Sequence, residues 1–333
     1  MSNIKTWKLV AENLEQNIQV MLLYVLESKG SSPGRQGFFM AVNIEGDMEG
    51  SIGGGIMEHK FVEMARKRMK DEGISNKEQG AGNEEIGINI RKQFHDKSAA
   101  KDQSGMICSG EQTILLYPLK KNEGTVVQSI IASLEENKNG TLTFSPVGIQ
   151  FDTTIPLKDF DYSFESEHNW LYKEKTGYKN QLFIIGGGHC ALAFSKLMRS
   201  MDFYIRAYDE RKDLKTMVEN DAAHEKCFVS DYTELKKLIP SGNSHYVVIM
   251  TVGYRTDDAA LRALLGKEFR YIGLLGSQTK IEKMLDDYRE EGIKDEWLQP
   301  IHTPIGLAIR SQTPEEIAVS IAAEIISVKN HYL

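Results

Sequence analysis

The chain has 333 residues, of which 41% are hydrophobic and 26% are charged, and its formal net charge is −7 at pH 7. This composition is that of a soluble globular protein, and the length suits two domains. The negative balance argues against a nucleic-acid backbone as partner, because binding it needs a basic face. The longest uncharged runs are too short to span a membrane, and no secretory signal pattern is present at the N-terminus. The three cysteines, Cys108, Cys190 and Cys227, are too scattered for a disulfide framework or a zinc knuckle. We therefore expect a cytoplasmic protein that binds neither nucleic acid nor membranes.

The first half of the chain is typical of an α/β domain with a mixed sheet. Ile4, Trp7 and Leu14 recur at helical spacing, which predicts a helix over residues 4–18. The other elements expected in this half are strands over 19–28, 38–43, 46–52, 86–94, 112–117 and 142–147, and helices over 56–70 and 125–137.

Residues 29–37, KGSSPGRQG, form the first of three glycine-rich loops in this half. Ser32 and Arg35 offer a hydroxyl and a cation to an oxyanion. Taken by itself, the segment is equally typical of an ordinary polar loop.

A second glycine run, with Gly53, Gly54 and Gly55 after Ser51, leads from a strand into the helix over 56–70. Backbone N–H groups and the positive end of a helix dipole at one point suit a phosphate. Glu58 lies in the first turn of this helix, where we favour interaction with the helix dipole over the role of a catalytic acid.

The third loop opens the stretch GMICSGEQTILLYP, residues 105–118, and contains Cys108. A cysteine is usually a small buried hydrophobe. A glycine-rich loop beside other anion-binding turns can also lower the pKa of a thiol, so a reactive thiolate is an equal alternative.

A charge-rich stretch over 152–180 indicates an irregular connector between two domains. We place an N-terminal domain at 1–160, the connector at 161–179 and a C-terminal domain at 180–333.

The C-terminal domain opens on QLFIIGGGHCALAF, in which Gly186, Gly188 and Ala191 match the pattern G-x-G-x-x-A between a strand and a helix. The helix dipole and the N–H groups beside His189 suit a phosphate. A tight turn that binds nothing is the alternative.

Asp209 ends the next predicted strand, about 20 residues after the glycines, where such folds place the acid that holds a ribose. Its alternative roles are those of a helix N-cap or a surface acid. Arg211 leaves open whether the ligand carries a 2′-phosphate.

Strands over 227–229, 246–251 and 271–275 alternate with helices over 231–238, 256–265 and 277–291. This alternation predicts a Rossmann-like, doubly wound parallel sheet. Ligands bind such sheets beyond the carboxyl ends of the strands. The loops that carry Thr251, Asp257, Gly276 and Ser277 should therefore face the same crevice as the glycine turn.

The tail begins with Thr313, Pro314 and Glu316, the pattern of a capping box. The helix that follows, 317–328, is apolar on nearly every side, which indicates burial between domains or between chains. We expect a homodimer.

Several of these motifs together resemble the XdhC/CoxI family of accessory proteins. The stretches that carry the resemblance are SSPGRQG, GSIGGGIMEHKFVE, GMICSGEQTILLYP, LFIIGGGHCALAF, YIGLLGSQTK and IHTPIGLAIRSQTPEEIAVSIAAEII. The resemblance implies a maturation factor that binds molybdenum cofactor (molybdopterin) and delivers it to the apoenzyme of a molybdenum hydroxylase such as xanthine dehydrogenase. A cysteine desulfurase is a further candidate partner.

The resemblance also implies a set of cofactor-binding positions, with Cys108 as a candidate molybdenum ligand. They are Ser32, Arg35, Ser51, Gly53, Gly54, Gly55, Glu58, Cys108, Gly186, Gly188, His189, Asp209, Thr251, Asp257, Gly276 and Ser277. The sequence departs from the family pattern where Val252 and Tyr254 replace histidines and where Gln278 and Thr279 replace basic residues.

Two other functions stay open from the residues alone. The glycine turn and Asp209 also suit an NAD(P)-dependent oxidoreductase, or a regulator that senses a nucleotide. We find no convincing pair of catalytic base and substrate-binding cation in the sequence, which favours a cofactor-binding accessory protein over an enzyme.

Overall fold

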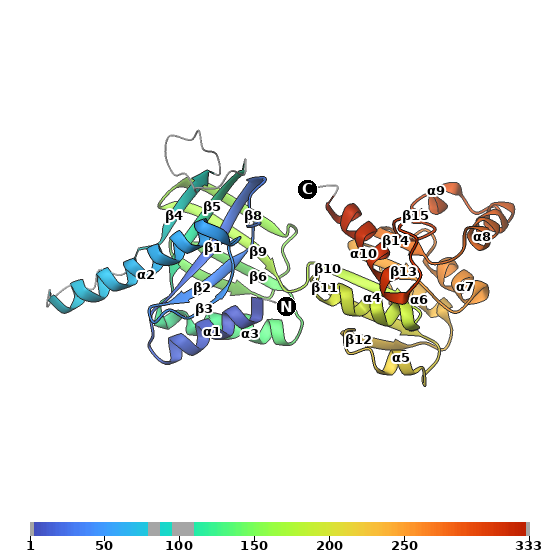
Figure 1. Ribbon diagram of the computed structural model, residues 1–333, viewed down its shortest axis with the longest axis horizontal. Coiled ribbons are helices and arrows are strands. Elements are labelled where there is room, and N and C mark those ends of the chain that lie inside the picture. The colour runs from blue at the N-terminus through green and yellow to red at the C-terminus, as the bar shows by residue number, and fades with distance from the viewer. Residues whose placement is uncertain (1–2, 79–86, 95–109, 331–333) are drawn as a thin grey trace. The chain divides into compact units, whose positions relative to one another are not determined.

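The computed structural model describes residues 3–78, 87–94 and 110–330 (Figure 1). The chain divides into two compact units, Met1–Gly177 and Tyr178–Leu333. No helix of the described residues is long and apolar enough to cross a membrane.

Within its described residues, the N-terminal unit combines three long helices with two sheets. Its elements are α1 (Asn3–Glu15), β1 (Val20–Gly30), β2 (Phe39–Asn43), β3 (Met48–Gly50), α2 (Gly55–Glu78), β4 (Asn89–Phe94), β5 (Gly110–Pro118), η1 (Lys121–Glu123), α3 (Gly124–Glu135), β6 (Gly140–Ser145), β7 (Gly148–Asp152), β8 (Phe160–Ser166) and β9 (Asn169–Thr176). The strand orders are β3-β2-β1-β5-β4 and β7-β6-β9-β8.

All described strand pairs of these two sheets are antiparallel, although we expected a mixed sheet. The short connections from β1 to β2 and from β2 to β3 explain the difference, because a parallel pair needs a long crossover between its strands.

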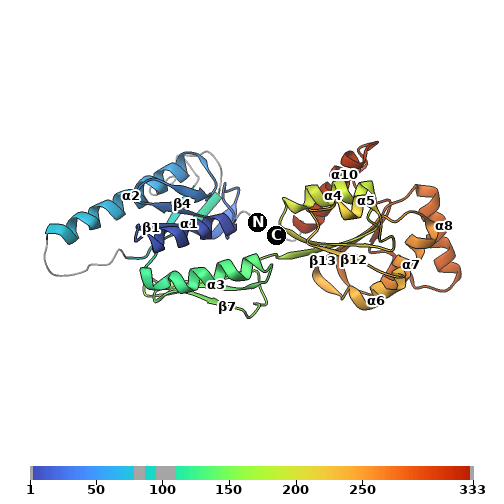
Figure 2. The same ribbon diagram turned by 90° about the horizontal axis from the view of Figure 1, so that it is seen from below.

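The central strand β1 is buried on both faces. Leu22 and Tyr24 point into the core that the two sheets share with α1 and α3, whereas Met21 and Leu23 pack against the side chains of α2. Figure 2 shows α1 and α3 side by side on this unit. A strand buried on both faces has no polar alternation, which is why β1 appears in the sequence as a continuous apolar run.

The predicted connector at 161–179 is wrong, because most of β8 and all of β9 lie there. Trp170, Tyr172 and Glu174 alternate into the core of the N-terminal unit, and Glu174 is only 4% exposed. Its carboxylate accepts hydrogen bonds from the hydroxyls of Tyr24, at 2.5 Å, and Tyr172, at 2.9 Å. In the sequence Glu174 stands between Lys173 and Lys175, and these three charges together resemble the charge pattern of a loop.

The C-terminal unit is a parallel six-stranded sheet in the order β12-β11-β10-β13-β14-β15. Its elements are β10 (Asn180–Ile185), α4 (His189–Arg199), β11 (Phe203–Asp209), α5 (Lys215–Val218), β12 (Glu225–Phe228), η2 (Tyr232–Glu234), α6 (Leu235–Leu238), β13 (Gly242–Ile249), α7 (Tyr254–Leu264), β14 (Phe269–Leu274), α8 (Gln278–Glu290), α9 (Asp295–Leu298), β15 (Ile301–His302) and α10 (Pro314–Asn330). The predicted Rossmann-like sheet is confirmed, with the strand order reversing between β10 and β13.

Helices cover both faces of this sheet. The helices α4 and α10 pack on one face, around Ile184 and Phe194, and α7 and α8 pack on the other, around Ile185 and Leu261 (Figure 2). Strands buried in this way on both faces read as the short apolar runs that the sequence contains.

The tail helix α10 starts at the predicted capping box. Glu316 N–H donates to Thr313 Oγ1 at 3.2 Å, and the Glu316 carboxylate accepts from Thr313 N–H at 3.2 Å. The burial of α10 takes place within its own unit, because Ile321 is fully buried in the core against α4. The buried side of α10 therefore needs no domain or dimer interface, whereas Val319, at 51%, and Ile326, at 36%, remain exposed.

Candidate functional site

The glycine turn between β10 and α4 fits tightly against the next strand of the sheet. Gly186 has φ +104°, and a Cβ atom there would lie 2.3 Å from the carbonyl oxygen of Met250, just beyond the end of β13. Its N–H donates to Tyr208 O at 2.8 Å. Only glycine satisfies both the positive φ and this close approach, so the first glycine of the motif serves the fold.

Gly188 differs, because a Cβ atom there would meet no atom within 4 Å. It is the N-cap of α4, and among the described residues no side chain caps this helix. The first N–H groups of α4 are therefore donors that a ligand can satisfy, and the positive end of the helix dipole lies beside them. His189 is exposed and lines a groove of about 450 Å³ between α4 and α10.

Asp209, at the end of β11, is fully buried. Its Oδ2 accepts hydrogen bonds from Gly187 N–H at 2.7 Å and from Arg211 Nη2 at 2.8 Å, and its Oδ1 accepts from Arg211 N at 2.8 Å and Nε at 2.9 Å. Burial by itself would raise the pKa of Asp209, but these bonds hold it below its ordinary value. Asp209 therefore fixes the glycine turn and the arginine rather than facing solvent.

Thr251, Asp257 and Lys280 form a second cluster at the same edge of the sheet. Asp257 is fully buried, and its Oδ1 accepts from Thr251 N at 3.1 Å and from Thr251 Oγ1 at 2.6 Å. Its Oδ2 pairs with Lys280 Nζ. Ser277 caps α8 by accepting from Lys280 N–H at 3.4 Å, so its hydroxyl has a structural role at the helix N-terminus.

These contacts join the four loops that we expected to gather. Asp209 bonds the glycine turn, Gly186 lies against Met250, and Lys280 reaches Asp257. We call these loops, residues 186–189, 209–211, 251–257 and 276–280, the carboxyl edge. Sequence reasoning missed Lys280, because we looked for a cation at Gln278 and Thr279, whereas the helix turns the next residue toward Asp257.

In the N-terminal unit, the loops after β1 and β3 and the start of β5 also meet. Gln112 Nε2 donates to Gly34 O at 2.9 Å and to Ile52 O at 3.3 Å. A Cβ atom on Gly110 would lie 2.6 Å from Ser31 O. The structure therefore brings three sequence motifs, far apart along the chain, into backbone contact.

The donors of the second glycine loop are engaged within the protein. Glu58 Oε2 accepts from Ile52 N at 2.9 Å, from Gly54 N at 3.0 Å and from Ser51 Oγ at 2.7 Å. Ser51 Oγ in turn accepts from Gly53 N at 3.0 Å. The carboxylate of Glu58 thus occupies the position in which we expected an external phosphate, which agrees with the favoured role of Glu58 at the helix N-terminus.

The first loop presents its cation more freely than its hydroxyl. Ser32 is buried, and its Oγ lies 2.6 Å from Ser28 Oγ. Arg35 is exposed and donates from Nη1 to Gly30 O at 3.1 Å. Gly55, which begins α2, is also exposed.

Two family models match this chain. The model described as XdhC Rossmann domain matches residues 182–325, and the model described as XdhC and CoxI family matches residues 13–75. The chain belongs to the XdhC/CoxI family.

Relatives of this XdhC/CoxI chain include an "uncharacterized protein YqeB" of Escherichia coli, 23% identical over 319 residues, which are 95% of this chain and 45% of that protein. A protein of Bacillus subtilis, named as a probable component of xanthine dehydrogenase, is 34% identical over 82 residues, 25% of this chain and 23% of that protein. The chain thus spans less than half of either relative.

A crystal structure described as a xanthine dehydrogenase from Bacillus halodurans has the same fold. It superposes with a TM-score of 0.69 at 22% identity, covering 100% of this chain and 97% of that one.

Cys108, the candidate molybdenum ligand, lies outside the described residues of this XdhC/CoxI chain. Within residues 3–78, 87–94 and 110–330, no group of three or more histidine, cysteine or acidic side chains could hold a metal ion. Cys190 and Cys227 are both partly buried, and burial raises the pKa of each thiol.

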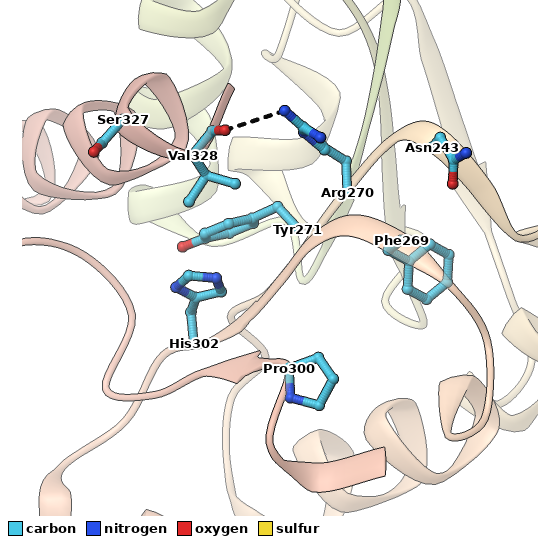
Figure 3. A pocket seen from close by; sticks show the side chains of 8 residues that line it. All are labelled: Asn243, Phe269, Arg270, Tyr271, Pro300, His302, Ser327 and Val328. Atoms are coloured by element: carbon cyan, nitrogen blue, oxygen red, sulfur yellow. Dashed lines mark hydrogen bonds between the residues drawn. The ribbon is translucent and has the colours of Figure 1, made fainter. Parts of the chain in front are cut away.

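A cavity of about 610 Å³ lies near the amino ends of β13 and β14 (Figure 3). His302 stacks on Tyr271 with ring centroids 4.4 Å apart, and both side chains bond the carboxylate of Glu324, at 3.2 Å and 2.5 Å. Arg270 Nη2 donates to Val328 O at 3.4 Å (Figure 3). These contacts attach the last turns of α10 to the sheet.

Proposed function

We propose that this chain is an accessory protein that binds molybdenum cofactor and delivers it to the apoenzyme of a molybdenum hydroxylase of the xanthine dehydrogenase type. The observation that carries the proposal is the match to XdhC-type models in both units of the chain. The names of the relatives from Bacillus subtilis and Bacillus halodurans support the same class of client.

The carboxyl edge fits the phosphate-bearing part of such a cofactor. The uncapped start of α4 offers N–H donors, and the open side of Gly188 lets a phosphate approach the backbone. Arg211 lies beside this turn and is 44% exposed, so it can donate to a second anionic group. Two further residues of the edge, His189 and Thr251, extend the set of polar groups.

We further propose, on the grounds of sequence alone, that Cys108 of the N-terminal unit is a soft ligand for molybdenum. When bound, the cofactor supplies a molybdenum centre with sulfur and oxygen ligands. A thiolate matches such a metal better than a hydroxyl or a carboxylate does. The exposed Arg35 lies in a loop that meets the start of β5 near Gly110, two residues after Cys108 in the sequence. As further parts of the proposal, the protein works in the cytoplasm as a homodimer, and a cysteine desulfurase supplies sulfur.

The proposal is tested by anaerobic incubation of the purified full chain with molybdenum cofactor, followed by gel filtration. Molybdenum and pterin, the latter detected by its fluorescence, should elute with the protein in equimolar amounts. The loaded protein should activate a cofactor-free molybdenum hydroxylase. Cofactor that elutes separately, with no activation above that given by free cofactor, would overturn the proposal.

A further inference from the structure

The acid that usually recognises a ribose in this fold is not available to a ligand here. Each oxygen of Asp209 accepts two hydrogen bonds, at 2.7 to 2.9 Å: Oδ2 from Gly187 N and Arg211 Nη2, and Oδ1 from Arg211 N and Nε. The side chain has no exposed surface. A ribose diol would have to break the bond from Gly187 and displace Arg211. The carboxylate therefore acts as a positioning residue within the protein.

Arg211 receives its geometry from this buried carboxylate. It donates to Asp209 from Nε and Nη2, side-on, which fixes the plane of the guanidinium. Among the described residues none accepts a hydrogen bond from Nη1, and the side chain is 44% exposed. A guanidinium that is held along one edge and open along the other is pre-organised to bind a phosphate through two parallel hydrogen bonds.

Of the charged residues just after β11, Arg211 is the cation whose side chain is held in one orientation. Glu210 Oε1 accepts from Tyr232 N at 3.2 Å, and its carboxylate also lies close enough to Arg211 to interact with it electrostatically. Lys212 is exposed at the next position and forms no ion pair within the part of the chain that the structure describes. In this sheet order, the end of the second strand of the unit lies where the 2′ substituent of a bound nucleotide is recognised.

We propose that Arg211, positioned by Asp209, makes the carboxyl edge selective for ligands that carry a phosphate monoester beside the group bound at α4. A bare ribose diol would find a cation without an acceptor for its hydroxyl protons. This inference rests on the phosphate-binding role of the same edge in the proposed function. It specifies a ligand class: nucleotides or pterin compounds with two separate anionic groups.

The test compares adenosine 2′,5′-bisphosphate with adenosine 5′-monophosphate by titration calorimetry on the full chain. The bisphosphate should bind about tenfold or more tightly, which corresponds to one charge-assisted bidentate contact. Arg211→Gln should remove this difference, because the bisphosphate then has no guanidinium for its second phosphate. Lys212→Gln changes the net charge equally at an exposed neighbour and should preserve the difference.

Equal affinities for the two nucleotides in the unaltered protein would overturn the selectivity but leave the phosphate site standing. A loss of selectivity in Lys212→Gln as large as in Arg211→Gln would show a diffuse charge effect and also overturn the inference. Failure of both nucleotides to bind at millimolar concentration would remove the phosphate site itself. Cofactor retention and enzyme activation are measured separately, so each outcome is distinguishable from failure of the delivery function.

Discussion

The backbones of Gly34 and Gly53 lie against each other so closely that neither position has room for a side chain. A Cβ atom on Gly53 would lie 2.4 Å from Gly34 N, and one on Gly34 would lie 2.0 Å from Ile52 O. Gln112 donates to the carbonyl groups of both loops. Two motifs about twenty residues apart in the sequence thus form a single packed layer.

Gly34→Ala should therefore destabilise the N-terminal unit strongly, by about 3 kcal/mol, because backbone atoms must move to admit the methyl group. Gly54→Ala is the matched control. A Cβ atom there meets nothing within 4 Å, but its φ is +74°, so we expect a loss of only ~1 kcal/mol from backbone strain. Urea unfolding followed by circular dichroism measures both. Equal losses for the two variants would contradict the packing account.

Substitutions at two glycines of the turn between β10 and α4 should have different effects, one on folding and the other on binding. Gly188→Val places its side chain in open space at the start of α4 and should abolish phosphate binding while the melting temperature stays close to that of the unaltered chain. Gly186→Ala meets Met250 O at 2.3 Å and has φ +104°, so it should lower the melting temperature. Calorimetric titration and thermal melts check the pair. Full affinity of Gly188→Val would remove the start of α4 from the site.

Lys280→Gln should destabilise the C-terminal unit by about 2 to 3 kcal/mol at neutral pH. The substitution leaves the fully buried carboxylate of Asp257 without its cation, although Thr251 still donates to it. Because Lys280 is 25% exposed, water offsets part of the loss. Lys283→Gln, an exposed lysine on the same helix, is the control and should change the unfolding free energy by less than about 0.5 kcal/mol. A similarly small effect of both substitutions would show that the ion pair between Lys280 and Asp257 contributes little to the free energy of unfolding.

His224 is held in its neutral form. Its Nδ1 accepts from Ile205 N–H at 2.9 Å, so Nε2 carries the proton and bonds the hydroxyl of Tyr178. Burial, followed by the charge of Arg199, lowers its pKa from 6.5 to about 4. Protonation would turn the acceptor at Nδ1 into a second donor and break the bond from Ile205.

The unfolded chain therefore binds a proton at this position at higher pH than the folded chain does. Stability from His224 should be complete above about pH 6.5 and should fall as the pH drops toward about 4, by on the order of 2 kcal/mol after allowance for partial exposure. The difference in unfolding free energy between the unaltered chain and His224→Gln should show this slope. His168→Gln, at an exposed position, should not. A pH-independent difference for His224→Gln would mean that folding does not shift the pKa of this imidazole.

Cys108→Ser should keep the fold but release molybdenum from the loaded protein, because serine is nearly isosteric and a far poorer soft-metal ligand. Molybdenum content after gel filtration and activation of a cofactor-free hydroxylase are the measurements. Cys190→Ser is the control, since that thiol lies in α4 with a raised pKa. Normal retention and activation by Cys108→Ser would exclude the thiol from the mechanism.

The sequence alone determined the Rossmann-like sheet of the C-terminal unit. Short apolar runs bounded by glycine, as in residues 182–185, are a local signal that survives folding, because parallel strands are buried on both faces. The capping box at Thr313 and Glu316 was also predicted and is present. The strand with Glu174 was missed, since only the hydroxyls of Tyr24 and Tyr172 make a carboxylate acceptable in the core.

Tertiary structure decided what each candidate residue does. Sequence spacing placed Asp209 where a ribose acid belongs, but the three-dimensional structure engages its carboxylate with Gly187 and Arg211. It likewise directs Glu58 to the glycine loop and Lys280 to Asp257. The physical reason is that a hydrogen-bonding group can face either a ligand or its own chain. Spacing along the sequence gives the chemistry of that group, whereas its partner is fixed only when distant segments pack together.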